Sequence, residues 1–89
     1  MVNIVENHAE IEGELLESSQ QTDLPGFVAL TIRIASASAV GNWPNLFTRD
    51  IGQTITVRAR ADTPAALSPR GPIRLKVKKV GPSLSFAEE

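Results

Sequence analysis

The span 52–81 contains two stretches in which apolar and polar residues alternate strictly, and this pattern constrains the fold more than any other feature. The alternating stretches cover 53–61 and 72–80. A period of two is typical of β-strands with one buried face and one solvated face. The polar positions include five cations, namely Arg58, Arg60, Arg74, Lys76 and Lys78. If the two strands pair as an antiparallel hairpin, their shared outer face is strongly basic.

The length of 89 residues suits one small domain over 1–89, with 1–8 as a leading arm and 82–89 as a C-terminal tail. A chain of this length buries only about 60–65% of the surface that its unfolded form exposes, so we expect modest stability. The chain contains no cysteine, which excludes disulfides and thiolate zinc sites and fits a cytoplasmic protein. The sequence shows no signal peptide and no apolar run near the about 20 residues of a membrane-spanning helix.

Charge is distributed unevenly although the net charge is only −1, which excludes a histone-like basic protein. Residues 1–25 contain six acids and neither lysine nor arginine, whereas 26–80 contain all nine cations against Asp50 and Asp62. Such asymmetry predicts electrostatic pairing, either inside the fold or across an interface.

Two further strands are predicted at 9–17 and 27–35, and a weak one near 46–49. In the first, Gly13 interrupts the alternation and indicates a bulge. Thr63 and Pro64 predict one helical turn, as N-cap and first helical residue. The predicted inward positions are Ile11, Leu15, Val28, Leu30, Ile32, Ile34, Ile55, Val57, Ile73, Leu75 and Val77.

This order of strands, with a glycine-bearing strand first (Ile11-Glu12-Gly13-Glu14-Leu15) and a glycine-led strand later (from Gly52), resembles the OB-fold. The resemblance covers roughly residues 9–80 and rests on pattern, without a diagnostic motif. It implies an all-β, five-stranded Greek-key barrel in which 46–49 is the third strand. A small β-sandwich or an SH3-like barrel is the alternative.

Catalysis has little support, because the chain has one histidine and lacks a phosphate loop or a recognisable triad. His8 and its neighbours Glu6, Glu10 and Glu12 could form a mixed metal site, but a solvated acidic strand end explains them better. We expect no enzyme and no catalytic, cofactor or metal site.

The basic strand faces are the better candidate for function. OB-type barrels bind single-stranded nucleic acid through cations and aromatic stacking platforms. Trp43 and Phe47 are expected in an exposed loop as platforms, whereas Phe27 and Phe86 are expected as core residues or barrel-end plugs. The candidate residues for nucleic-acid or partner binding are Arg33, Trp43, Phe47, Arg58, Arg60, Arg74, Lys76, Lys78 and Lys79.

A role in assembly is the other hypothesis, and the sequence slightly favours it. Glu10, Glu12 and Glu14 form an acidic stripe that could pair with a basic strand of a second copy or of another protein. The same stripe could instead lie beside Arg58 and Arg60 of its own barrel, where cross-strand pairs contribute about 0.2–1 kcal/mol each. The two predicted functions are therefore protein interaction or self-association, and single-stranded nucleic-acid binding.

Overall fold

The computed structural model describes residues 5–20, 25–81 and 84–88 of the chain. Seven elements follow each other in these residues: β1 (Ala9–Ser19), β2 (Phe27–Ala39), the 3-10 turn η1 (Thr48–Asp50), β3 (Thr54–Arg60), the 3-10 turn η2 (Pro64–Leu67), β4 (Gly71–Gly81) and β5 (Leu84–Glu88). Strands dominate, and no helix in the described part of the chain is long and apolar enough to cross a membrane.

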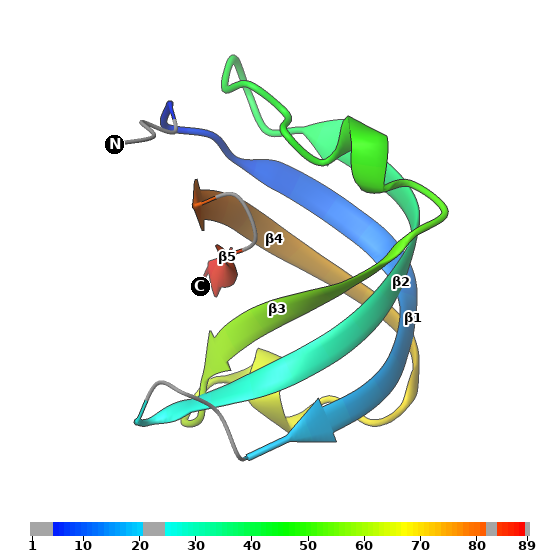
Figure 1. The fold of residues 1–89 in the computed structure, drawn as a ribbon, viewed down its shortest axis with the longest axis vertical. Helices are drawn as coiled ribbons and strands as arrows, with labels where there is room; N and C mark the ends of the chain where they lie inside the picture. The colour runs from blue at the N-terminus through cyan, green and yellow to red at the C-terminus, as the bar shows by residue number, and fades with distance from the viewer. Residues whose placement is uncertain (1–4, 21–24, 82–83, 89) are drawn as a thin grey trace.

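The five strands close into a barrel in the order β1-β2-β3-β5-β4, with β4 pairing back onto β1 (Figure 1). All neighbours are antiparallel except β3 and β5, which run parallel. The expected all-β barrel is confirmed, and its closed five-stranded form is OB-like. Closure gives every strand a neighbour on both sides, although β3 pairs with β5 only at Val57 and Arg58, and paired edges are protected from edge-to-edge association.

Strand β1 pairs with two neighbours, β2 on one side and β4 on the other. The register with β2 shifts between Glu12 and Gly13, which marks the predicted bulge. A Cβ atom on Gly13 would lie 2.0 Å from the carbonyl oxygen of Arg33 on β2. Glycine is therefore required here, since any side chain would collide with the neighbouring backbone.

The core fills the barrel interior with side chains from all five strands, with Ala87 as the contribution of β5. Its buried members include eight of the predicted inward residues, namely Ile11, Leu15, Val28, Leu30, Ile32, Ile34, Val57 and Val77. The other three, Ile55, Ile73 and Leu75, are partly buried and pack against this cluster. The prediction of the core is thus confirmed, and it rested only on the alternation of apolar and polar residues.

The predicted third strand at 46–49 is wrong. Phe47 points into the barrel and is completely buried, and its backbone N–H donates to Oδ1 of Asn45. The backbone N–H of Asp50 then donates to the carbonyl of Phe47, so the segment coils into η1 instead of extending. The fifth strand is β5, formed by residues that the sequence placed in a tail. Its Ser85 and Ala87 face the interior, opposite β3 and β4.

The predicted hairpin of 53–61 with 72–80 is also wrong in its pairing, although both strands exist. β5 lies between β3 and β4 and pairs with each of them (Figure 1). The predicted turn between them is present as η2, with Thr63 as N-cap and Pro64 at the start. The Thr63 hydroxyl, however, donates to the carbonyl of Arg60 and does not cap η2.

Candidate nucleic-acid interface

An aromatic side chain lies between two cations on the outer face of the sheet β3-β5-β4. Phe86 of β5 is in register with Arg58 of β3 on one side and with Lys78 of β4 on the other. The flanking residues Ser85 and Ala87 face inward, so Phe86 faces outward with its two neighbours. On the antiparallel pair β4–β5, side chains directly opposite each other have Cβ atoms about 4.5–5.5 Å apart. The three side chains therefore form one row across the barrel surface.

A second aromatic ring extends this row toward β2. The ring centroids of Phe27 and Phe86 lie 5.5 Å apart in an edge-to-face arrangement with an interplanar angle of 68°. Phe27 is in register with Arg60 on the outer face of β3. Both rings are partly exposed, which corrects the expectation that they plug the core or the barrel end. The aromatic pair instead lies on the surface among cations.

The basic residues of this face are Arg58, Arg60, Lys76 and Lys78, which we call the outer basic face together with Phe27 and Phe86. In the part of the chain that the structure describes, no ion pair involves Arg60, Lys76 or Lys78. Glu88 is the single carboxylate of β5, and it is in register with Lys76. The face therefore has a positive balance on a chain whose net charge is −1.

Arg33 and Arg74 do not join the outer basic face. Arg33 forms an ion pair with Glu14, and Arg74 forms one with Glu12 at 2.7 Å. Glu10 is in register with Lys76 of β4. The expectation that the acidic stripe lies beside Arg58 and Arg60 is wrong, because β1 neighbours β2 and β4 and not β3.

The two ion pairs border a shallow surface groove beside the Gly13 bulge. The groove has a volume of about 670 Å³ and includes Ile34 and Ile73 in its lining. Its four charged side chains are two glutamates and two arginines, so their charges cancel and the groove offers no surplus positive charge to a nucleic acid.

Lys79 and Phe47 also lie outside the outer basic face. Lys79 is in register with buried Ser85 and points toward the barrel end, where its Nζ lies 2.9 Å from a carboxylate oxygen of Asp50. The same Nζ lies 5.0 Å from the centroid of the Phe47 ring. Phe47 is therefore a core plug covered by an ion-paired lysine, and the prediction that it offers a stacking surface is wrong.

Trp43 is exposed as predicted, with 45% of its surface accessible, and it lies beside the N-terminal arm. Its ring meets the ring of His8 edge-on, with centroids 4.9 Å apart. The backbone N–H of His8 donates to the carbonyl of Pro44, which holds the arm against this loop.

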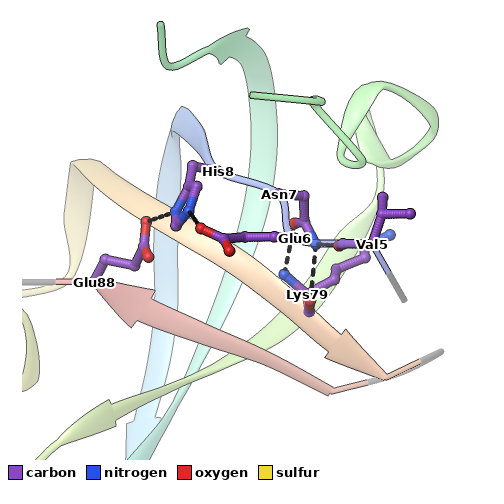
Figure 2. Close-up of polar contacts among 6 residues, drawn as sticks. All are labelled: Val5, Glu6, Asn7, His8, Lys79 and Glu88. Atoms are coloured by element: carbon purple, nitrogen blue, oxygen red, sulfur yellow. Dashed lines mark hydrogen bonds and ion pairs between the residues drawn. The ribbon is translucent and has the colours of Figure 1, made fainter. Parts of the chain in front are cut away.

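His8 joins the arm to the end of β5 (Figure 2). Its Nδ1 lies 2.7 Å from a carboxylate oxygen of Glu88, and its Nε2 lies 3.1 Å from one of Glu6. Hydrogen bonding to Glu6 and then to Glu88 raises the pKa of His8 above its usual 6.5. Glu10 and Glu12, which the sequence placed near His8, contact β4 and β2 instead. Across the described residues, no three side chains are arranged to hold a metal ion.

Asn7 extends the sheet with its side chain where the arm runs past β4 (Figure 2). Its Nδ2 donates to the carbonyl of Lys79, and its Oδ1 accepts from the backbone N–H of the same residue, both at 2.9 Å. The side-chain amide therefore replaces a backbone partner for β4. Asn7 is 1% exposed, so these two bonds are shielded from water.

The sequence contains one pattern that predicts the position of Phe86 and that was not used above. Ser85 and Ala87 alternate with Leu84, Phe86 and Glu88, which is a short period of two. Small inward residues are typical of a strand that closes a crowded barrel, and they place Phe86 outside.

Comparison with known proteins adds no family to this geometry. No family model, curated protein or solved structure matches the chain.

Proposed function

We propose that the protein binds single-stranded nucleic acid on the outer basic face. The row of Arg58, Phe86 and Lys78 across three neighbouring strands carries this proposal. Single-strand binders combine cations that follow the phosphate backbone with aromatic rings on which bases stack. The face supplies both within a few ångströms, and OB-type barrels are a common scaffold for this chemistry.

The chemistry of the face predicts binding that depends on salt and not on sequence. Three cations, Arg60, Lys76 and Lys78, that each neutralise one phosphate give a slope of log K against log salt of about −2.1 for a single strand. A fourfold rise in salt then weakens binding about 18-fold. Two phenylalanine rings stack on any base, because every base has a π-face.

Fluorescence anisotropy with a labelled single-stranded oligonucleotide tests the proposal at low salt. Lys78→Gln should weaken binding and make the salt slope less steep by about 0.7. Phe86→Leu keeps an apolar side chain but removes the ring, and it should cost about 1–3 kcal/mol of binding free energy. Arg70→Gln is the matched control, since Arg70 is an exposed cation on the loop before β4 and lies outside the face.

Two results would refute the proposal. The first is the absence of binding up to about 100 µM protein at low salt, the weak end of non-specific affinities. The second is an equal loss of affinity in Lys78→Gln and Arg70→Gln, which would show a diffuse charge effect without a site.

Assembly through the acidic stripe has less support from the geometry. Glu12 and Glu14 already have partners in their own chain, Arg74 and Arg33. An intermolecular contact would first have to break these pairs, so the stripe does not point to a second copy. Self-association stays a prediction that sedimentation can test.

A further inference from the structure

His8 connects two segments of the chain through both nitrogens of one ring. The acceptors are the carboxylates of Glu6 on the arm and Glu88 at the end of β5 (Figure 2). A carboxylate accepts hydrogen bonds but cannot donate them, and a neutral imidazole carries a single N–H. Both contacts can be hydrogen bonds only in the imidazolium form. The geometry is therefore that of a protonated His8.

The charged groups around His8 come from every element packed against it. Lys78 and Lys79 of β4 line the same hollow as His8, which has a volume of about 440 Å³. Lys79 is occupied by Asp50 of the η1 turn. From the loop before η1, His8 meets only the uncharged ring of Trp43 and the carbonyl of Pro44.

Glu88 connects this cluster to the outer basic face. It lies two residues after Phe86 on the same side of β5, and it is in register with Lys76. With His8 protonated, the cluster of Glu6, His8 and Glu88 has one net negative charge. Loss of the proton leaves two negative charges, and one of them lies beside a lysine that we assign to phosphate binding.

We propose that His8 is a pH-sensitive switch for the nucleic-acid site, so that the protonated form binds a single strand more tightly than the neutral form. This inference rests on the proposed function of the outer basic face. In the protonated form, the imidazolium neutralises Glu88 and fixes the end of β5, which carries Phe86. In the neutral form, Glu88 competes with phosphate for Lys76. The raised pKa of His8 is consistent with this arrangement and places the switch above pH 6.5.

The size of the effect follows from Coulomb's law. For an assumed separation of about 7 Å from the bound phosphate, a unit charge changes affinity about threefold at the dielectric constant of water, before screening by salt. We therefore expect wild-type affinity to fall by up to about threefold as pH rises through the pKa of His8.

The experiment measures two quantities on the full chain between pH 5.5 and 8.5 at constant ionic strength. One is the affinity for a labelled single-stranded oligonucleotide. The other is the pKa of His8, read from its ring proton resonances by NMR, which are unambiguous because the chain has one histidine. The variants are His8→Gln and Glu88→Gln, and Glu17→Gln is the control because it removes an exposed carboxylate of β1.

The proposal predicts that the midpoint of the affinity change equals the NMR pKa. In Glu88→Gln the NMR pKa should move to lower pH, the affinity transition should become smaller because the competing carboxylate is gone, and binding at high pH should be tighter than wild type. Glu17→Gln should leave both midpoints in place, and His8→Gln should bind weakly at every pH without the transition.

Two outcomes overturn the switch while leaving the proposed function intact. One is wild-type pH dependence in His8→Gln, and the other is an affinity transition of wild-type size that persists in Glu88→Gln. If no oligonucleotide binds at any pH, the proposed function fails and the switch with it. The NMR titration then still shows whether Glu88 and His8 are coupled.

Discussion

Among the glycines of this barrel, Gly13 is the one where an added methyl group meets the closest backbone contact, so Gly13→Ala should lower the free energy of unfolding. A Cβ atom there would lie 2.0 Å from the carbonyl oxygen of Arg33 and 3.1 Å from Cα of Ile34, both of them backbone atoms of β2. Contacts below 3.0 Å are essentially never made by real Cβ atoms, so Gly13→Ala must push the two strands apart by about 1 Å. The displacement falls on the bulge that lets β1 pair with β2 and β4 at once.

The expected cost can be set against the stability of the domain. Overpacking costs about 1–3 kcal/mol, and a rigid backbone obstacle places this substitution at the upper end. The lower entropy of the unfolded alanine variant returns about 0.4–1 kcal/mol. The net loss is about 2–3 kcal/mol, from a total of about 4–13 kcal/mol for 89 residues at the usual stability per residue.

Urea denaturation followed by far-UV circular dichroism measures this loss. With a slope of about 1 kcal/mol per molar, the midpoint of Gly13→Ala should fall by about 2–3 M. Gly81→Ala is the matched control in β4, because its Cβ would meet only the Leu84 Cβ at an ordinary 3.5 Å. Midpoints of the two variants within about 0.5 M of each other would show that the close approach of β1 to β2 does not exist.

Four further measurements test other parts of the structure. Phe47→Ala should lower the free energy of unfolding by about 3–5 kcal/mol in a thermal or urea melt, because the ring is fully buried; an exposed ring would leave it unchanged. Asn7→Ala should cost about 1–3 kcal/mol in the same assay, since a backbone N–H and carbonyl of β4 lose their partner. Because the pKa of His8 is raised, its stabilising contribution is complete below pH 6.5 and is lost as pH rises through the folded pKa. The difference in melting temperature between wild type and His8→Gln should therefore be larger below that pKa than above it, and an equal difference at both pH values would contradict this. Sedimentation at low salt should show one 9.6 kDa species; oligomers that disappear on reversal of Glu12 and Glu14 to lysine would instead support assembly.

Alternation predicted the four long strands and most of the core, because each inward residue is set by its own strand. Ile32 and Val57 are buried for the same local reason, a period of two with one apolar face. The predicted third strand is wrong because Phe47 is buried inside the barrel and the chain around it coils into η1. This burial depends on contacts with distant strands, which the local sequence pattern does not show. Residues 84–88 were missed because a strand with Ser85 and Ala87 inward buries little apolar surface.

The candidate site was predicted by residue type but not by partner. Arg58, Arg60, Lys76 and Lys78 lie on one surface as the alternation indicated. The partners of Arg33 and Arg74 depend on which strand lies beside β1, and this follows from the closure of the barrel. Phe86 joined the site for the same reason, since only the insertion of β5 between β3 and β4 brings it beside the cations.

The insertion of β5 also determines the order in which this molecule can be completed. β3 and β4 are successive strands in the sequence, yet they do not pair with each other. β3 pairs with β2 and β4 with β1, and Leu84–Glu88 supplies the partner on the second edge of each. The contact between β1 and β4 likewise joins residues about sixty positions apart in the sequence. Closing the barrel therefore costs a large loop-closure entropy before the non-local contacts stabilise it. Until β5 pairs, the sheet of the first four strands has two open edges, on β3 and on β4, which other chains can join. Arg60 on β3 and the lysines of β4 lie on these two edge strands, and charged side chains on an edge strand disfavour pairing with another chain.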